Sequence, residues 1–386
     1  MIEGDGASET LRVLFEPEVP PMGWAAFHVV PGAAPVASVA AWERGLENAF
    51  LRIELDEQGA ITGLLDKRNG RQVVQPGERA NVWQFFQDGP EREAAWNVHD
   101  TFENRQYPMT EPARITVIER GPVRAAVRVE RQFRNTRICY DIALYAQTPR
   151  VDFVADVDWQ ERQTMLKVAF PVAVRSPQAT YEIQFGAIQR PTHRNTSWDQ
   201  TKFEVPAQRW ADLSEAGYGV SLLNDSRYGY DVRGNVLRLT LLRGPEYPDP
   251  EADRGQHQFR YALLPHVGDW AQGETVRRAR ELNEPMLAVP TVGGGQVGAH
   301  SYLQVRGPGV VVETLKPAED GDGWVLRLYE AHGGRGTVDL KSDRALARVV
   351  ACNMVEEALR EVPVADGRVS ADIGPFEVQS YRLRFA

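Results

Sequence analysis

Cysteine is scarce in this chain, which has only Cys139 and Cys352 among its 386 residues. Two cysteines so far apart do not form a disulfide framework, and their scarcity favours a reducing compartment. We therefore expect a cytoplasmic protein. Cys139 lies inside an alternating strand pattern, so we expect it to be a small buried hydrophobic residue.

Long apolar runs are also missing. No stretch of about 18 apolar residues occurs, so no transmembrane helix is expected. The first residues, Met1 to Gly6, lack the charged start and apolar centre of a signal peptide. The sequence therefore predicts no membrane partner.

Positive charge is in deficit, with 44 Lys and Arg against 53 Asp and Glu and a net charge of −9. Phosphate groups would be repelled over most of such a surface, which argues against a nucleic-acid partner. A neutral substrate such as a sugar suits this charge better.

Helical periodicity is nearly absent and appears clearly only over residues 274–282. Period-two alternation is common instead, as in residues 123–129, where the odd positions are apolar and two even positions are Arg. Such alternation is typical of a sheet with one buried face. Residues 50–56 and 61–65 predict a hairpin, and the residues after 300 predict about seven strands of a sandwich. The fold class is therefore mainly β.

Polar, aromatic and turn residues gather between Phe185 and Trp270. Asp249, Asp253 and His257 surround a Pro-rich turn between one strand ending at Leu242 and another beginning near Gln258. Loops held between rigid strands often present side chains to a ligand. This stretch is therefore the predicted functional region.

The same stretch carries a family resemblance. The blocks are Arg-Pro-Thr-His (190–193), Asn-Thr-Ser-Trp-Asp (195–199), Lys-Phe-Glu (202–204), Leu-Leu-Arg (241–243) and Pro-Asp (248–249). In this order they resemble the C-terminal β region of glycoside hydrolase family 38, the retaining, zinc-dependent α-mannosidases, and above all its cytosolic and vacuolar branch.

The resemblance implies three domains. Residues 1–44 would be the remnant of a small β domain with a linker, and residues 45–285 a large antiparallel super-sandwich of the galactose-mutarotase type. Residues 286–386 would form a smaller C-terminal β-sandwich. The catalytic domain, with its nucleophile and its zinc ion, would lie outside this chain.

The resemblance also implies that this chain holds no catalytic residue, metal ligand or cofactor of its own. None of its seven histidines is followed two residues later by Asp, as the zinc motif of the family requires. The expected role is to support the hydrolysis of terminal α-mannosides in the complete enzyme. Its expected partners are the upstream catalytic domain and carbohydrate, with self-association as a further possibility.

Arg243 is the leading candidate for a contact with substrate. Apolar Leu237, Leu239 and Leu241 share its face of a strand, so the guanidinium emerges where the strand ends. There it can bond sugar hydroxyls or an upstream carboxylate. The alternative is a structural ion pair with Asp249 or Asp253.

A second constellation combines an indole with polar groups that suit sugar hydroxyls. It consists of His193, Asn195, Trp198 and Asp199. The alternative is a self-stabilised loop with Trp198 in the core. Asp249, Asp253 and His257 complete the predicted substrate-binding set, and we expect His193 and Arg243 to share one rim.

Two other functions stay open at this point. The chain can be a stand-alone carbohydrate-binding or scaffold module, or a mutarotase-like epimerase that uses His193 and His257 as base and acid. If its catalytic partner is separate, an apolar patch with Trp198, Phe203 and Trp210 should be exposed.

Overall fold

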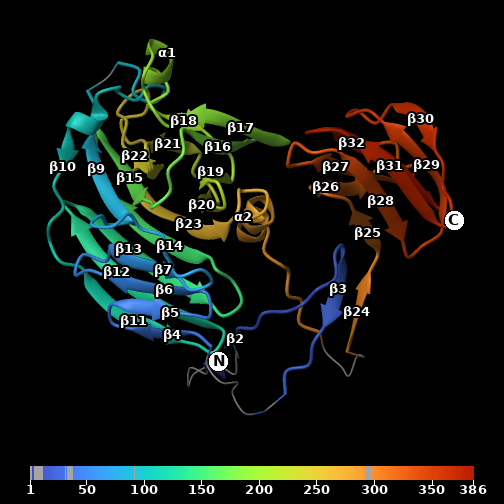
Figure 1. The fold of residues 1–386 in the computed structure, drawn as a ribbon, viewed down its shortest axis with the longest axis horizontal. Coiled ribbons are helices and arrows are strands. Elements are labelled where there is room, and N and C mark those ends of the chain that lie inside the picture. The colour runs from blue at the N-terminus through green and yellow to red at the C-terminus, as the bar shows by residue number, and fades with distance from the viewer. Residues whose placement is uncertain (1, 4–11, 31, 33–37, 91, 292–296) are drawn as a thin grey trace. The chain divides into compact units, whose positions relative to one another are not determined.

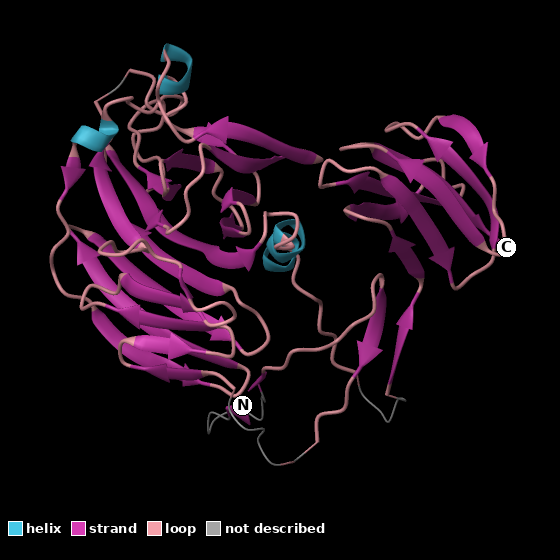
Figure 2. Ribbon diagram, viewed as in Figure 1, coloured by secondary structure: helices cyan, strands magenta, loops and turns pink. Residues whose placement is uncertain are grey.

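The computed structural model describes residues 2–3, 12–30, 32, 38–90, 92–291 and 297–386. Antiparallel strands make up nearly all of the regular structure (Figure 1, Figure 2), which confirms the mainly β prediction. Part of the predicted linker lies outside the described residues.

The chain divides into two compact units. The first contains Met1–Leu14, Ala34–Glu182 and Ile188–Met286, and the second contains Phe15–Ala33, Ile183–Ala187 and Leu287–Ala386. The division into three domains stays a prediction.

Two large antiparallel sheets form the first unit. The six-stranded sheet has the order β10–β9–β15–β22–β21–β18, with β9 (Val82–Gln87), β10 (Gln106–Tyr107), β15 (Thr164–Pro171), β18 (Val205–Pro206), β21 (Gly229–Arg233) and β22 (Val236–Arg243). The nine-stranded sheet has the order β11–β12–β13–β14–β23–β20–β19–β16–β17, with β11 (Arg114–Arg120), β12 (Arg124–Phe133), β13 (Thr136–Tyr145), β14 (Val151–Trp159), β16 (Gln178–Ile183), β17 (Gly186–Pro191), β19 (Trp210–Glu215), β20 (Tyr218–Asn224) and β23 (Gly255–Val267).

A smaller five-stranded sheet accompanies them. It contains β4 (Ala40–Trp42), β5 (Gly45–Glu47), β6 (Leu51–Leu55), β7 (Ile61–Asp66) and β8 (Arg71–Gln72), and the predicted hairpin corresponds to β6 and β7. The short strands β1 (Ile2–Glu3) and β2 (Arg12–Val13) pair with each other.

The two large sheets pack face to face as the predicted super-sandwich. Alternation explains the packing, since the odd residues of β12 from Ala125 to Val129 are fully buried. The Tyr261 ring of the nine-stranded sheet stacks on Phe153 at 4.7 Å and meets Phe170 of the six-stranded sheet at 6.2 Å. Trp83 Nε1 donates across the same interface to the Tyr261 hydroxyl at 3.1 Å.

Helices are few among the described residues: η1 (Phe102–Asn104), α1 (Ser197–Gln200) and α2 (Thr275–Asn283). α2 confirms the predicted helix, and it packs on β19 and β20 with Val276, Ala279 and Leu282 buried. None of these helices has the length and apolar character needed to cross a membrane.

The second unit contains three antiparallel sheets. They are β3 (Gly23–Ala26) with β24 (Gly298–Ser301); β25 (Leu303–Arg306), β28 (Gly336–Ser342) and β31 (Arg368–Ile373); and β26 (Val310–Pro317), β27 (Trp324–Glu330), β32 (Val378–Phe385), β29 (Leu346–Cys352) and β30 (Ala358–Val362). Leu326, Val349 and Leu383 are fully buried in a core of its own. β30 is an edge strand that the sequence did not predict, because four of its five residues are exposed and no alternation marks it.

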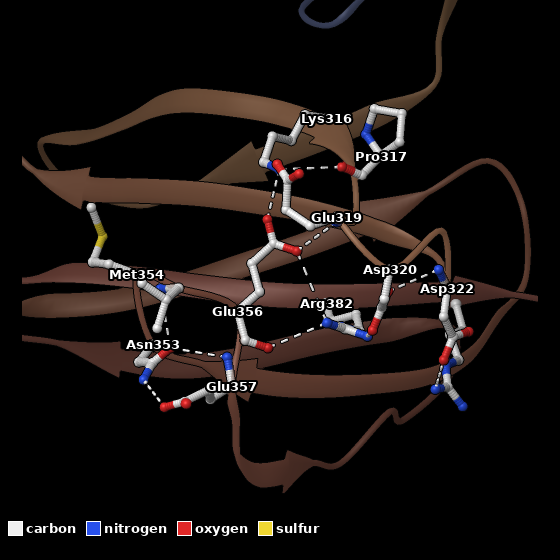
Figure 3. A network of polar contacts seen from close by, with 12 residues as sticks. Lys316, Pro317, Glu319, Asp320, Asp322, Asn353, Met354, Glu356, Glu357 and Arg382 are labelled. Carbon is white, nitrogen blue, oxygen red and sulfur yellow. Dashed lines mark hydrogen bonds and ion pairs between the residues drawn. The ribbon is translucent and has the colours of Figure 1, made fainter.

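An ionic network joins the turn between β26 and β27, the turn between β29 and β30, and Arg382 of β32 (Figure 3). Glu356, in the turn between β29 and β30, pairs with Lys316 Nζ at 2.6 Å and accepts from the Glu319 amide at 2.9 Å. Arg382 donates to the Glu356 carbonyl at 3.2 Å. The hydrogen bonds from Lys316 and from the Glu319 amide lower the pKa of Glu356, so the charged carboxylate ties the turn to Lys316 of β26.

Candidate functional site

Arg243 ends β22 and is held by two partners. Its Nε donates to Asp88 Oδ2 at 2.6 Å, and its Nη2 donates to the Asn97 carbonyl at 2.7 Å. Asp88 directly follows β9 and is 3% exposed. The ion pair expected as an alternative is therefore present, but its partner is Asp88 and not Asp249 or Asp253.

Three strand ends of the six-stranded sheet are tied together beside Arg243. The Asp88 amide donates to the Gln163 carbonyl at 2.7 Å, and the Gln163 amide donates to the Gly244 carbonyl at 2.7 Å. Gln163 also bonds Glu246 through its side chain. A Cβ at Gly244 would overlap the carbonyl oxygen of Glu161, so glycine is required for this close approach. We call Asp88, Gln163, Arg243, Gly244 and Glu246 the strand-end cluster.

Two exposed aromatic side chains belong to the loops of this cluster. Trp96 is 67% exposed and Tyr247 is 52% exposed, and their rings lie 6.3 Å apart. The Ala95 amide donates to the Tyr247 carbonyl at 3.2 Å, which joins the two loops. Exposed rings beside a fixed guanidinium provide both an apolar face and hydrogen-bond donors for a sugar.

Sequence reasoning missed Asp88, Trp96 and Tyr247. They lie in irregular segments where no period marks a residue as buried or exposed. The available signal was Asp-Gly-Pro (88–90) directly after an aromatic strand, followed by a lone Trp in a polar run.

The predicted residues Asp249, Asp253 and His257 contact mainly their own turn. Asp249 Oδ1 accepts from the Glu251 amide at 2.9 Å, and His257 Nε2 lies 2.6 Å from the carbonyl oxygen of Asp253. The carboxylate of Asp253 is thus not the partner of His257. Within the described ranges, no three His, Cys, Asp or Glu side chains are arranged to hold a metal ion. The residues present do not fit zinc, and zinc in an upstream domain stays a prediction.

The predicted His193 group lies at the other end of β22. The carbonyl of Thr192 accepts from the Gly234 amide at 2.8 Å, in the turn that precedes β22, whereas Arg243 ends that strand. His193 Nδ1 lies 3.6 Å from Asp199 Oδ2, and the Asn195 amide donates to Nδ1 at 3.4 Å. The structure therefore groups His193, Asn195 and Asp199 but does not bring them to Arg243.

The expected apolar patch needs correction. Trp198 is 79% exposed in α1 and not in the core, so it does contribute. Phe203 is partly buried against Phe86 and Phe102, and Trp210 is fully buried in β19. Loop-rich sequence suggested exposure for Trp210, but its register in β19 turns it inward beside Trp270 at 5.1 Å.

A buried ionic layer supports these loops on the outer face of the six-stranded sheet. Lys167 has no exposed surface and bonds both Glu204 and, at 2.9 Å, Asp231. Arg238 joins the layer through Asp231 at 3.3 Å and through Glu103 of η1 at 2.6 Å. Burial acts to lower the pKa of Lys167, but the charges of Asp231 and Glu204 outweigh it and the pKa is raised. Lys167 is therefore a structural cation and not a base.

A second buried cluster contains a serine, a histidine and an aspartate, the residue types of a hydrolase triad, but not in the geometry of a triad. His266 Nε2 lies 2.8 Å from Asp212 Oδ2 and 3.3 Å from Ser221 Oγ. A catalytic relay needs the acid and the hydroxyl on opposite ring nitrogens. All three residues are at most 2% exposed, and Ser221 Oγ also bonds Thr275 at the start of α2. This cluster packs α2 onto the sheet.

Comparisons with known proteins agree with this architecture. The family model "Glycosyl hydrolases family 38 C-terminal domain" matches residues 46–251, more than half of the chain. The model "Glycosyl hydrolases family 38 C-terminal beta sandwich domain" matches residues 309–381. A crystal structure of a family 38 protein from Enterococcus faecalis has a TM-score of 0.75 at 19% identity, over 91% of this chain and 45% of that one.

Relatives of greater length match over most of the chain. Alpha-mannosidase 2C1 of Mus musculus is 40% identical over 345 residues, which are 88% of this chain and 33% of the relative. An alpha-mannosidase of Saccharomyces cerevisiae is 32% identical over 378 residues, 88% of this chain and 35% of the relative. The chain thus spans about a third of the length of these curated relatives. It belongs to glycoside hydrolase family 38 and corresponds to the C-terminal β region of its α-mannosidases.

Proposed function

We propose that this chain is the accessory β region of a cytoplasmic α-mannosidase that hydrolyses terminal α-mannosides with retention. The reacting carboxyl groups and the zinc ion belong to a catalytic domain that packs against the chain. The chain supplies part of the wall of the substrate pocket. It also contributes contacts with carbohydrate.

The observation that carries the proposal is the preformed strand-end cluster. Asp88 and the Asn97 carbonyl fix Arg243, and the loops beside it expose Trp96 and Tyr247. A guanidinium held before the partner arrives loses little freedom on binding, so its contacts contribute more fully to affinity. Nε and Nη2 donate within the chain, which leaves Nη1 available for a hydroxyl or for a carboxylate of the partner.

The test is Arg243→Lys in the complete enzyme that contains this chain. Lys keeps the charge, but it lacks the planar guanidinium that bonds Asp88, the Asn97 carbonyl and a group outside the chain at the same time. We expect kcat/KM for an aryl α-mannoside to fall about tenfold to a hundredfold, equivalent to about 1.4–2.7 kcal/mol, mainly through KM.

The matched control is Arg79→Lys, an arginine paired with Asp56 in the same unit but outside the strand-end cluster. It should leave kcat/KM unchanged. Unaltered kinetics in Arg243→Lys, with normal thermal unfolding in both variants, would refute a role of Arg243 in the pocket.

A further inference from the structure

The nine-stranded sheet has an open groove on the face that points away from the six-stranded sheet. Its volume is about 410 Å³, within the range of about 300–1,000 Å³ typical of small-molecule sites. α2 covers β19 and β20 on this face, whereas the groove lies over β12, β13, β14 and β23. It uses none of the residues of the strand-end cluster.

Strand register builds the groove from one row of neighbours. Arg128 pairs with Asp141, Asp141 with Val154, and Val154 with Arg260. The exposed Val154, 45% accessible in the middle strand, is therefore an aliphatic floor between an acidic and a basic neighbour. The backbones of the two flanking strands are about 10 Å apart, since adjacent strands are spaced by about 4.8 Å.

Both arginines are oriented by carboxylates. Arg128 donates from Nε and Nη2 to Asp141 at 2.7 and 2.9 Å. Arg260 donates from Nε to Asp225 Oδ2 at 3.0 Å and lines the groove, which leaves its two terminal nitrogens available as donors to a ligand. Fixed donors of this kind are ready for a ligand without a further loss of side-chain freedom.

The next row supplies an acceptor. Cys139 pairs with Asp156, and Asp156 pairs with Gln258. Gln258 Nε2 donates to Asp156 Oδ2 at 2.9 Å, and no cation pairs with this carboxylate among the described residues. Asp156 can therefore accept hydrogen bonds from hydroxyl groups.

The charges select the class of ligand. Two guanidiniums and three carboxylates line the groove, so a phosphate or carboxylate meets an excess of negative charge. A cation would be repelled by the two guanidiniums. A neutral ring with many hydroxyls and one aliphatic face satisfies the donors, the acceptor and the floor together.

We propose that this groove is a second carbohydrate site that binds one neutral hexose ring, with its aliphatic face on Val154 and its hydroxyls on Asp156 and Arg260. The site is separate from the pocket wall at Arg243. It can hold a sugar of a branched substrate away from the bond being cleaved. The choice of a mannoside as one probe rests on the proposed function, whereas the site itself does not.

The test is calorimetric titration of the full chain with methyl α-mannoside, methyl α-glucoside and methyl α-galactoside. We expect saturable binding of at least one hexoside and none of inorganic phosphate or ethylamine. Val154→Arg should weaken that binding at least about tenfold, because it fills the groove. Ile118→Arg is the matched control, an exposed β-branched residue of β11 in the same sheet, 41% accessible and outside the groove.

A built-in reporter checks the location. Cys139, which the sequence predicted to be buried, is half-buried and lines the groove, whereas Cys352 belongs to the second unit. A saturating hexoside should slow maleimide labelling of Cys139 severalfold and leave that of Cys352 unchanged. The absence of hexoside binding, binding that survives Val154→Arg, or binding of phosphate alone would each overturn the proposal, whatever the Arg243→Lys kinetics show.

Discussion

Lys167 shows how one residue organises the outer face of the six-stranded sheet. A fully buried ammonium carries a large desolvation cost, and here the carboxylates of Glu204 and Asp231 offset it. Arg238 also pairs with Asp231, whereas Glu204 has no cation other than Lys167 among the ion pairs of the described residues. Lys167 and the two carboxylates therefore stabilise one another.

Lys167→Met should destabilise the first unit by about 3–5 kcal/mol, because it leaves the Glu204 carboxylate without its cation. Urea unfolding followed by tryptophan fluorescence measures the change. Lys67→Met is the matched control, since Lys67 pairs with Glu47 with its side chain 34% exposed, and such pairs contribute at most about 1 kcal/mol. A loss below about 1 kcal/mol for Lys167→Met would show that the buried pair is not required.

Gly244 is the second residue whose identity the structure explains. Gly244→Ala would force the added methyl group against the Glu161 carbonyl and displace the end of β22. We expect a loss of about 1–3 kcal/mol in unfolding free energy. Gly298→Ala, where a Cβ meets nothing within 4 Å, should stay within about 0.5 kcal/mol of the parent chain. Equal stability of the two variants would contradict the close approach at Gly244.

At the scale of elements, the positions of the strands can be predicted from the alternation of apolar and polar residues, whereas the contacts of the loops cannot. The odd residues of β12 and the helix at 275–283 are predictable because one face of each is buried and periodic. The position of Arg243 at a strand end follows from the same pattern. Its partner Asp88 does not, because it lies 155 residues away and only the pairing of β9, β15 and β22 brings the two together.

Glu103 of η1 anchors residues 92–105, between β9 and β10, because it pairs with Arg194, Arg233 and Arg238. Burial acts to raise the pKa of Glu103, but the hydrogen bond and charge of Arg238 and the charges of Arg194 and Arg233 outweigh it. The pKa is therefore lowered from its ordinary value of 4.5. A lowered carboxyl pKa contributes stability above the ordinary value, and this contribution is lost as pH falls through the folded value.

The segment should consequently loosen in acid while the sheets persist. Amide hydrogen-exchange protection in residues 92–105 should fall as pH drops from about 4.5 downward, relative to that in β12. Glu103→Gln should reduce the protection at neutral pH, by about 1.5–3 kcal/mol in opening free energy. It should also abolish the further fall in protection at low pH. If protection still falls at low pH in Glu103→Gln, another carboxyl group is responsible for that fall.

At the scale of the whole molecule, the chain should not hydrolyse mannosides by itself. The proposed function assigns the reacting carboxyl groups and the zinc ion to the catalytic domain, and the chain spans about a third of the length of its alpha-mannosidase relatives. Incubation of the chain with an aryl α-mannoside and added zinc should give no turnover. Turnover should appear when a separately produced upstream domain is added. Zinc-dependent turnover by the repurified chain alone would contradict the proposed accessory role.

The make-up of the second unit has a consequence for synthesis on the ribosome. This unit combines Phe15–Ala33 and Ile183–Ala187 with the last hundred residues, and β3 pairs only with β24 among the described strands. At roughly 5–20 residues per second, β3 leaves the ribosome tens of seconds before β24. During that interval the nascent chain carries an unpaired strand edge beside the exposed rings of Trp24 and Phe27. Chaperones that shield such edges should therefore engage this chain early and stay bound until β24 has left the ribosome.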